Sequence, residues 1–144
     1  MASWSEQKWE PSRHELLCRH CGKCCYKKIF IGRTVCITLF PCKYLDVHTN
    51  LCTIYERRHE VNPFCLSVPE GLRVSAFPAD CPYVAALAPQ SYVAARDDWD
   101  WKSEWHDFDE LADDLGVTPD IREMVRARGP EAPPLYLEAG RERT

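Results

Sequence analysis

The chain lacks any long hydrophobic run. The best candidate is YVAALA at 83–88, whereas a helix needs about 20 apolar residues to cross a bilayer. A membrane span is therefore excluded, and we expect no membrane partner. The N-terminal stretch MASWSEQKWEPSRHELL also lacks a basic segment followed by an apolar one, which is the pattern of a secretory signal. We therefore expect a cytoplasmic protein.

The motifs of several large enzyme classes are missing as well. The sequence has no G-x-S-x-G, H-E-x-x-H, P-loop or dinucleotide fingerprint. Its histidines stand at no recognisable catalytic spacing, so we assign no catalytic residue and leave open whether the chain is an enzyme. They are His14, His20, His48, His59 and His106. A repeat of basic and aromatic residues is also missing and the net charge is −4, so nucleic acid is not an expected partner.

Cysteine, in contrast, is abundant. The chain has nine cysteines, and CRHCGKCC at 18–25 holds four of them. Thiols this close together in a reducing compartment persist as thiolates, which need a cation, and an odd total argues against a fully paired disulfide framework. We therefore favour metal ligation over disulfides.

Charge is divided unevenly along the chain. Residues 13–73 carry ten Lys or Arg against five Asp or Glu, whereas residues 97–114 carry nine acids against Lys102 alone. The acidic segment either forms a solvated helix face or docks on the basic half that bears the cysteines. We favour the solvated face.

Local patterns predict short elements in the first half of the chain. An S-x-x-E capping box at Ser12–Glu15, with Gly22 as the stop, predicts a helix over 13–21. TVCITLF at 34–40 predicts a strand. The turn sequence DVHTN at 46–50 predicts a hairpin that brings Cys42 near Cys52.

The last third has a helical pattern. Apolar residues recur at helical spacing before Gly116, and Thr118–Pro119 predicts a last helix over 119–127. The apolar stripe consists of Trp101, Trp105, Phe108, Ala112 and Leu115. We expect a single small α+β domain that is helix-dominated, with a short β-hairpin, an irregular metal-stapled N-terminal half and a helical C-terminal part. Its expected regions are a Cys-rich metal-binding region at 12–96, an acidic Trp-rich helical extension packed on it at 97–128, and an extended tail at 129–144.

The spacing of the first cysteines is typical of metal ligands. Cys18, Cys21 and Cys24 repeat the C-x2-C spacing twice, as in the run that holds an iron–sulfur cluster, and Cys81–Pro82 resembles the remote Cys-Pro ligand of such clusters. Cys25 would serve a neighbouring centre or the opposite side of one cluster. The thiolate charge requires compensation, for which nearby cations are available: Arg19, Lys23, Lys27 and Lys28.

CRHCGKCC resembles the CxxCxxCC signature of the bacterial "putative zinc- or iron-chelating" domain family. PCKYLD, LCTIYERR, NPFC and PADCPY follow in the order typical of its short cytoplasmic YcgN-like branch, so that the resemblance spans about residues 16–84. The spacer between Cys25 and Cys42 is shorter than in that branch, and the stretch after residue 97 has no clear counterpart. The resemblance implies a set of metal ligands: Cys18, Cys21, Cys24, Cys25, Cys42, Cys52, Cys65 and Cys81. Cys36 lies outside the pattern and is interpreted as an ordinary buried thiol.

Three functions compete on this basis. The preferred one is a protein that holds an iron–sulfur cluster or a related iron centre, for electron transfer, sensing or support of a partner enzyme. The alternative is a structural or carrier zinc protein with two four-thiolate sites, and a lesser alternative is an iron-dependent enzyme of unknown reaction. The expected partners are metal ions, with a partner protein as a further candidate.

Overall fold

The computed structural model describes residues 17–18, 22–98, 101–132 and 135–136. The predicted helix over 13–21 and its capping box lie outside these residues, apart from Leu17 and Cys18, and so does Cys21. The described elements are, in order, η3 (Lys23–Cys25), β1 (Tyr26–Ile31), β2 (Thr34–Pro41), β3 (Leu45–Asp46), β4 (Leu51–Cys52), η4 (Tyr55–Arg57), α2 (Arg58–Val61), α3 (Val68–Arg73), α4 (Pro82–Leu87), α5 (Trp101–Glu104), η5 (Trp105–Asp107), α6 (Phe108–Asp114) and α7 (Pro119–Arg128).

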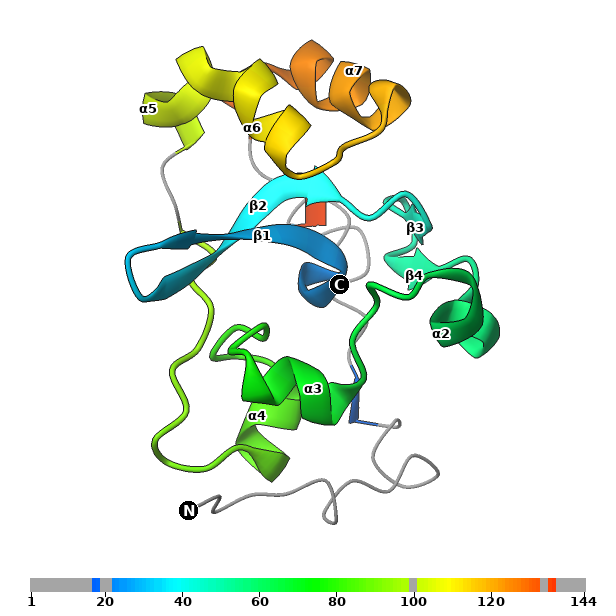
Figure 1. Cartoon of the computed structure of the whole chain (residues 1–144), viewed down its shortest axis with the longest axis vertical. Helices are drawn as coiled ribbons and strands as arrows, with labels where there is room; N and C mark the ends of the chain where they lie inside the picture. Colours follow the sequence, from blue (N-terminus) through cyan, green and yellow to red (C-terminus); the bar gives the residue numbers. More distant parts are fainter. Residues whose placement is uncertain (1–16, 19–21, 99–100, 133–134, 137–144) are drawn as a thin grey trace.

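An antiparallel hairpin of β1 and β2 lies at the centre of the molecule (Figure 1). The predicted strand over 34–40 is confirmed as β2, and its partner β1 is a strand that the sequence analysis missed. Ile31 pairs with Thr34, so that the turn between them has only two residues. Gly32 begins this turn with a φ of 64°, a conformation that strains residues with a side chain.

A second, smaller hairpin follows. β3 and β4 pair through Leu45 and Cys52, as the turn sequence DVHTN predicted. The architecture is therefore a small mixed α/β one with two β-hairpins and several short helices. The predicted hairpin is thus confirmed, and the second one, β1–β2, was missed because β1, with Lys27 and Lys28 in its sequence, does not show the alternation of a typical strand.

The helices α5, α6 and α7 lie together on one side of the β1–β2 hairpin (Figure 1). Leu39 and Phe40 of β2 form one buried cluster with side chains of α6, of α7 and of the link between these helices: Phe108, Ala112, Val117, Ile121 and Val125. The last predicted helix is confirmed as α7. The expected stripe from residue 101 is divided among α5, η5 and α6 instead of lying on one continuous helix.

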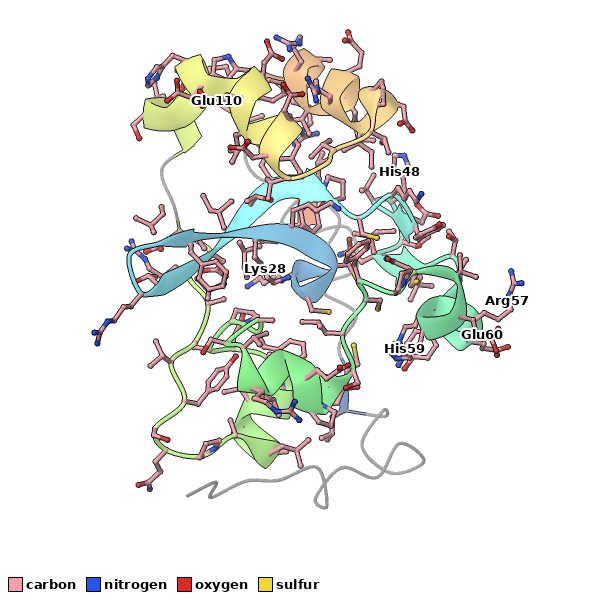
Figure 2. All side chains as sticks on the ribbon, in the orientation of Figure 1. Lys28, His48, Arg57, His59, Glu60 and Glu110 are labelled. Atoms are coloured by element: carbon pink, nitrogen blue, oxygen red, sulfur yellow. The ribbon has the colours of Figure 1, made fainter. Side chains whose placement is uncertain are left out.

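Acidic residues of α6 form ion pairs with arginines of α7. Arg122 of α7 binds Asp113 of α6 at 2.6 Å, and Arg126 pairs with Asp109. Asp109, Glu110, Asp113 and Asp114 are all exposed, as favoured from the sequence, and Glu110 lies on the outer side of α6 (Figure 2). Asp97 differs, because its carboxylate pairs with Lys23 in the cysteine-bearing half.

The helices α3 and α4 lie on the other side of the hairpin (Figure 1). Their contact is a third buried cluster made by Leu72, Phe77, Tyr83 and Leu87. A short segment links this layer to β2: Ala95 N–H donates to the Phe77 carbonyl at 3.0 Å, and Arg96 N–H donates to the Val35 carbonyl at 2.8 Å. The segment around residue 78 is thereby held near the central hairpin.

Two residues close to the C-terminus belong to the core. Leu135 and Tyr136 are buried with Tyr26 and other side chains of the hairpin. The rings of Tyr26 and Tyr136 meet edge to face, with their centroids 4.8 Å apart. Among the described residues, no helix is long and apolar enough to span a membrane.

Candidate metal centre

Five of the eight candidate cysteines lie in one neighbourhood. Cys24 and Cys25 belong to η3, Cys42 follows β2, and Cys52 and Cys65 come from β4 and from the segment after α2. The Cys42 N–H donates to the Cys25 carbonyl at 2.7 Å, which fixes the end of β2 against η3. Cys52 is brought in by its pairing with Leu45 in the second hairpin. This group is called the five-thiol cluster below.

Asn62 connects two members of the five-thiol cluster. Its side-chain Nδ2 donates to the Cys42 sulfur at 3.8 Å, and its carbonyl accepts from the Cys65 N–H at 3.1 Å. Sequence analysis missed this role. The only signal was the position of Asn62 within the NPFC motif, three residues before Cys65.

Lys28 is the cation of the five-thiol cluster. Its ammonium group donates to the carbonyl oxygens of Cys24 at 2.9 Å and Tyr26 at 2.7 Å. Lys28 is a residue of β1 and lies near the middle of the molecule (Figure 2). Its charge acts on four of the thiols: Cys24, Cys25, Cys42 and Cys65. Desolvation lowers the pKa of Lys28, and the thiolates oppose this by favouring its charged form.

The adjacent thiols of Cys24 and Cys25 have opposite protonation preferences. A hydrogen bond from Cys25 lowers the pKa of Cys24, with help from the charges of Lys28 and Arg58. Cys24 is an exposed residue, so solvent weakens this effect, but its direction favours a thiolate. The same hydrogen bond and burial raise the pKa of Cys25. Cys24 is therefore the more nucleophilic and more metal-ready of the two thiols.

Arg58 is a second cation near the thiols. Its guanidinium lies over the Tyr55 ring, 4.0 Å from the centroid, and donates to the Tyr55 carbonyl at 2.6 Å. Its charge lowers the pKa of Cys24 and opposes the rise that burial causes in the pKa of Cys65. Arg57, in contrast, points outward beside α2 (Figure 2).

Cys18 and Cys81 lie in a second neighbourhood. Both pack against the buried cluster of α3 and α4, and Cys81 directly precedes α4, whose first residue is Pro82. The structure therefore places seven candidate ligands in two neighbourhoods, the five-thiol cluster and this pair. Cys21, the eighth candidate, lies outside the described residues.

Cys36 is separate from both neighbourhoods. It is 1% exposed within β2, and its backbone forms a bridge with Arg96. Burial raises the pKa of its thiol. These observations agree with its interpretation as a buried thiol in the core.

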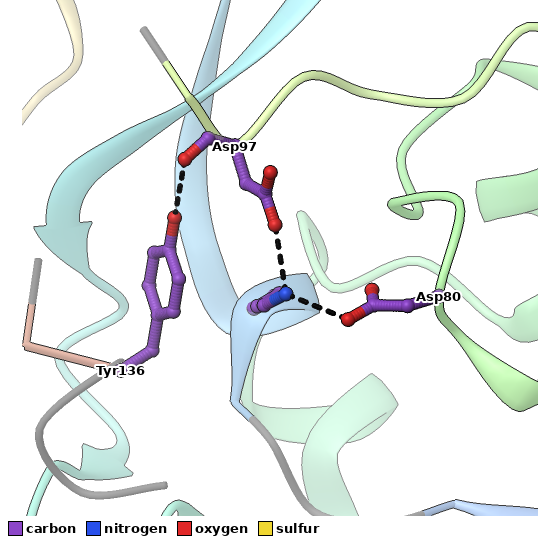
Figure 3. Close-up of polar contacts among 4 residues, drawn as sticks. Asp80, Asp97 and Tyr136 are labelled. Atoms are coloured by element: carbon purple, nitrogen blue, oxygen red, sulfur yellow. Dashed lines mark hydrogen bonds and ion pairs between the residues drawn. The ribbon is translucent and has the colours of Figure 1, made fainter. Parts of the chain in front are cut away.

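The cations expected around the thiols are not equivalent. Lys28 faces the five-thiol cluster, whereas the ammonium of Lys23 binds Asp97 at 2.7 Å and Asp80 at 3.0 Å (Figure 3). The charge of Lys23 is thus compensated by carboxylates. Arg19 lies outside the described residues.

The donor chemistry fits a thiophilic metal, because thiolates are the ligands that zinc and iron–sulfur centres share. Within residues 17–18, 22–98, 101–132 and 135–136, however, no group of three or more His, Cys, Asp or Glu is arranged to hold a metal ion. The described thiols therefore lie in common neighbourhoods, but no three of them are arranged around one point that could hold a metal ion.

The histidines within the described parts of the chain offer no acid–base constellation. His48, His59 and His106 are all exposed, and His59 lies in α2 on the side toward α3 (Figure 2). His106 has a carboxylate neighbour, Asp107, at 3.1 Å, also at the surface. His14 and His20 lie outside the described residues.

The chain is similar to curated proteins over part of its length. It is 35% identical over 106 residues to a UPF0260 protein of Gluconobacter oxydans, which covers 71% of this chain and 56% of that protein. It is 37% identical over 78 residues to a UPF0260 protein of Rhodobacter capsulatus, covering 51% of this chain and 52% of the relative. An uncharacterized protein of Methanocaldococcus jannaschii is 39% identical over 71 residues, which is 49% of this chain and 53% of the relative.

The chain thus spans about half the length of the curated relatives it matches. No family model matches it, and no solved structure does. Its bacterial homologues belong to the UPF0260 family.

Proposed function

We propose that this chain is a cytoplasmic metal-binding protein that holds iron, as an iron–sulfur cluster or a related iron centre, through clustered cysteine thiolates. The ligands would come from Cys18, Cys21, Cys24, Cys25, Cys42, Cys52, Cys65 and Cys81. The centre would serve electron transfer, sensing or the support of a partner enzyme. The resemblance to the CxxCxxCC family and its YcgN-like branch supports metal binding and leaves the reaction undefined.

The observation that carries the proposal is the convergence of four thiols on one lysine, with the fifth, Cys52, beside Cys65. Cys36, 1% exposed in β2, shows a cysteine that serves only as a small core residue. Cys25 and Cys42 also pack against a buried cluster, but four separate segments bring the five thiols within the field of Lys28 or of one another. Such gathering costs desolvation and mutual repulsion once the thiols ionise, and a bound cation would offset both.

Binding would require the thiol side chains to turn toward the metal. The backbone bonds of Cys25 and Cys42 and the hairpin position of Cys52 would keep the donors near one another. Iron is preferred over zinc because Cys24 and Cys25 are adjacent, and neighbouring thiolates serve a multinuclear cluster more readily than one tetrahedral ion. The alternative remains zinc, in two four-thiolate sites, with an iron-dependent enzyme as a lesser candidate.

The choice of metal has a direct test. We expect the full chain purified without oxygen to be brown, with a broad visible absorbance that dithionite bleaches, and with iron found by elemental analysis. Iron–sulfur clusters absorb because thiolate and sulfide electrons transfer to iron(III), whereas zinc complexes with thiolates are colourless. A colourless preparation that contains stoichiometric zinc would contradict the iron centre and support the alternative.

Lys28 provides a second test. We expect Lys28→Met, which keeps much of the length of the side chain, to weaken metal binding about tenfold, because outer partners of metal ligands typically contribute factors of 10–100. Competition with a chelator measures this affinity. Lys27→Met removes the same charge one residue earlier and is the control, expected to stay close to the unchanged protein. Equal effects of both substitutions would show that only the net charge matters, and not the fixed position of Lys28.

A further inference from the structure

Lys23 is a nearly buried cation with two acidic partners from distant parts of the chain. The residue is 8% exposed, and its ammonium lies 3.0 Å from Asp80 and 2.7 Å from Asp97, which are 57 and 74 residues away in the sequence. It also lies 5.8 Å from the centre of the Tyr136 ring. The Tyr136 hydroxyl donates to the Asp97 carbonyl at 3.2 Å (Figure 3). Four segments of the chain therefore meet at one ammonium group.

The positions of these residues in the sequence connect them to the thiols. Lys23 directly precedes Cys24 and Cys25 in η3, and Asp80 directly precedes Cys81. The Lys23–Asp80 ion pair therefore joins the backbone that carries the five-thiol cluster to the backbone that carries Cys81. A shift of either charged residue would move the thiol next to it.

Other contacts hold each end of this ion pair. On the η3 side, Cys25 N–H donates to the Gly22 carbonyl at 2.9 Å, and Cys42 N–H donates to Cys25. On the other side, Cys81 N–H donates to the Pro78 carbonyl at 3.1 Å. Each segment is thus ordered locally, and the ion pair adds a direct link between them to the backbone bonds that tie Phe77 and Ala95 to the hairpin.

The two carboxylates have different surroundings. The side chain of Asp80 is 66% exposed, whereas that of Asp97 is 36% exposed. Asp97 also follows Arg96, whose backbone is bonded to β2. Loss of Asp97 would leave a buried cation poorly compensated and would disturb the core, whereas loss of Asp80 alone would leave Lys23 paired with Asp97. Asp80 can therefore be changed without removing the main partner of Lys23.

We propose that the Lys23–Asp80 ion pair is a positioning device that brings Cys81, and the Cys18 neighbourhood with it, to the five-thiol cluster, so that one metal centre takes ligands from both neighbourhoods. This inference rests on the proposed function. Lys23 and Asp80 act through the cysteines that follow them and bind no metal themselves.

The test measures each thiol separately in the full chain. The protein is loaded with Zn²⁺ alone and treated with iodoacetamide, and alkylation of each cysteine is measured by mass spectrometry with and without a chelator. Zinc is suitable because it takes thiolate ligands whatever the native metal is. In the unchanged protein, Zn²⁺ is expected to protect both Cys42 and Cys81.

We expect Asp80→Asn to raise the alkylation of Cys81 in the zinc-loaded protein about threefold to fivefold, as expected for the loss of one ion pair with an exposed carboxylate, while Cys42 stays protected. Asp98→Asn is the matched control, because Asp98 binds the exposed Arg96 at 3.0 Å and lies next to Asp97. It should behave as the unchanged protein. Lys23→Arg keeps the cation and should retain at least part of the protection of Cys81.

The outcomes separate the two proposals. If Zn²⁺ protects no thiol of the unchanged protein, the proposed metal binding fails. If Zn²⁺ protects Cys42 but not Cys81, or if Asp80→Asn leaves Cys81 protected, the positioning role is overturned while metal binding stands. A rise in alkylation at every cysteine of Asp80→Asn would show general destabilisation and would also overturn the positioning role. A selective rise at Cys81 supports it.

Discussion

Replacing Cys24 by serine is expected to abolish the bound iron and the visible absorbance of the protein purified without oxygen. Cys24 interacts with Cys25, with both nearby cations and with the Cys65 thiol, so it is an integral member of the five-thiol cluster. Serine keeps the size of the side chain but offers a hydroxyl, a poor ligand for the metals that thiolates prefer. Iron content and the anaerobic optical spectrum are the measurements.

The matched control for this substitution is Cys36→Ala. Cys36 is buried in β2 and stands apart from both cysteine neighbourhoods, so its loss should leave the iron content and the spectrum unchanged. Circular dichroism shows whether each variant keeps its fold. If Cys24→Ser bound as much iron as Cys36→Ala, the five-thiol cluster would not be the metal centre.

Replacing Phe40 by alanine is expected to lower the free energy of unfolding by about 3–5 kcal/mol, the usual range for a fully buried phenylalanine. Phe40 is 0% exposed, and its ring centre lies 5.3 Å from that of Phe108. It belongs to the cluster that joins β2 to α6 and α7. The substitution would leave a cavity between the hairpin and the helical layer, which urea unfolding would measure.

Phe30→Ala removes the same side chain from the neighbouring strand. Phe30 is 72% exposed, so its loss should change stability by less than about 0.5 kcal/mol, as is typical of surface substitutions. A similar loss for both variants would contradict the packing of α6 and α7 on β2.

Elements with a local signal were predictable from the sequence. Three elements are encoded by patterns of only a few residues, which a short window of sequence contains. They are the β-branched and aromatic run of β2, the Thr118–Pro119 start of α7 and the turn between β3 and β4. β1 was missed because its sequence, YKKIFI, lacks the alternation of a typical strand. The helical stripe was placed correctly in the core, since Trp105, Phe108, Ala112 and Leu115 pack there, but the breaks at η5 were not visible in the periodicity.

The candidate ligands were chosen from spacing and from a family resemblance, and neither indicates which thiols meet. That Cys24, Cys25, Cys42, Cys52 and Cys65 gather, and that Cys18 and Cys81 lie beside α3 and α4, follows from the path of the chain. Lys23, inside the CxxCxxCC motif, and Lys28, three residues after it, could not be distinguished from the sequence. Their partners distinguish them, since Lys28 faces thiols and Lys23 faces carboxylates.

The sequence by itself determined which donor groups this protein can offer, a dense set of thiols, and the short elements that local patterns encode. The tertiary structure alone decided which donors share a neighbourhood and which charges compensate one another. The physical reason is range: Lys23 reaches its partners across 57 and 74 residues, and contacts of that separation depend on how strands pair and layers pack, which no short window of sequence contains.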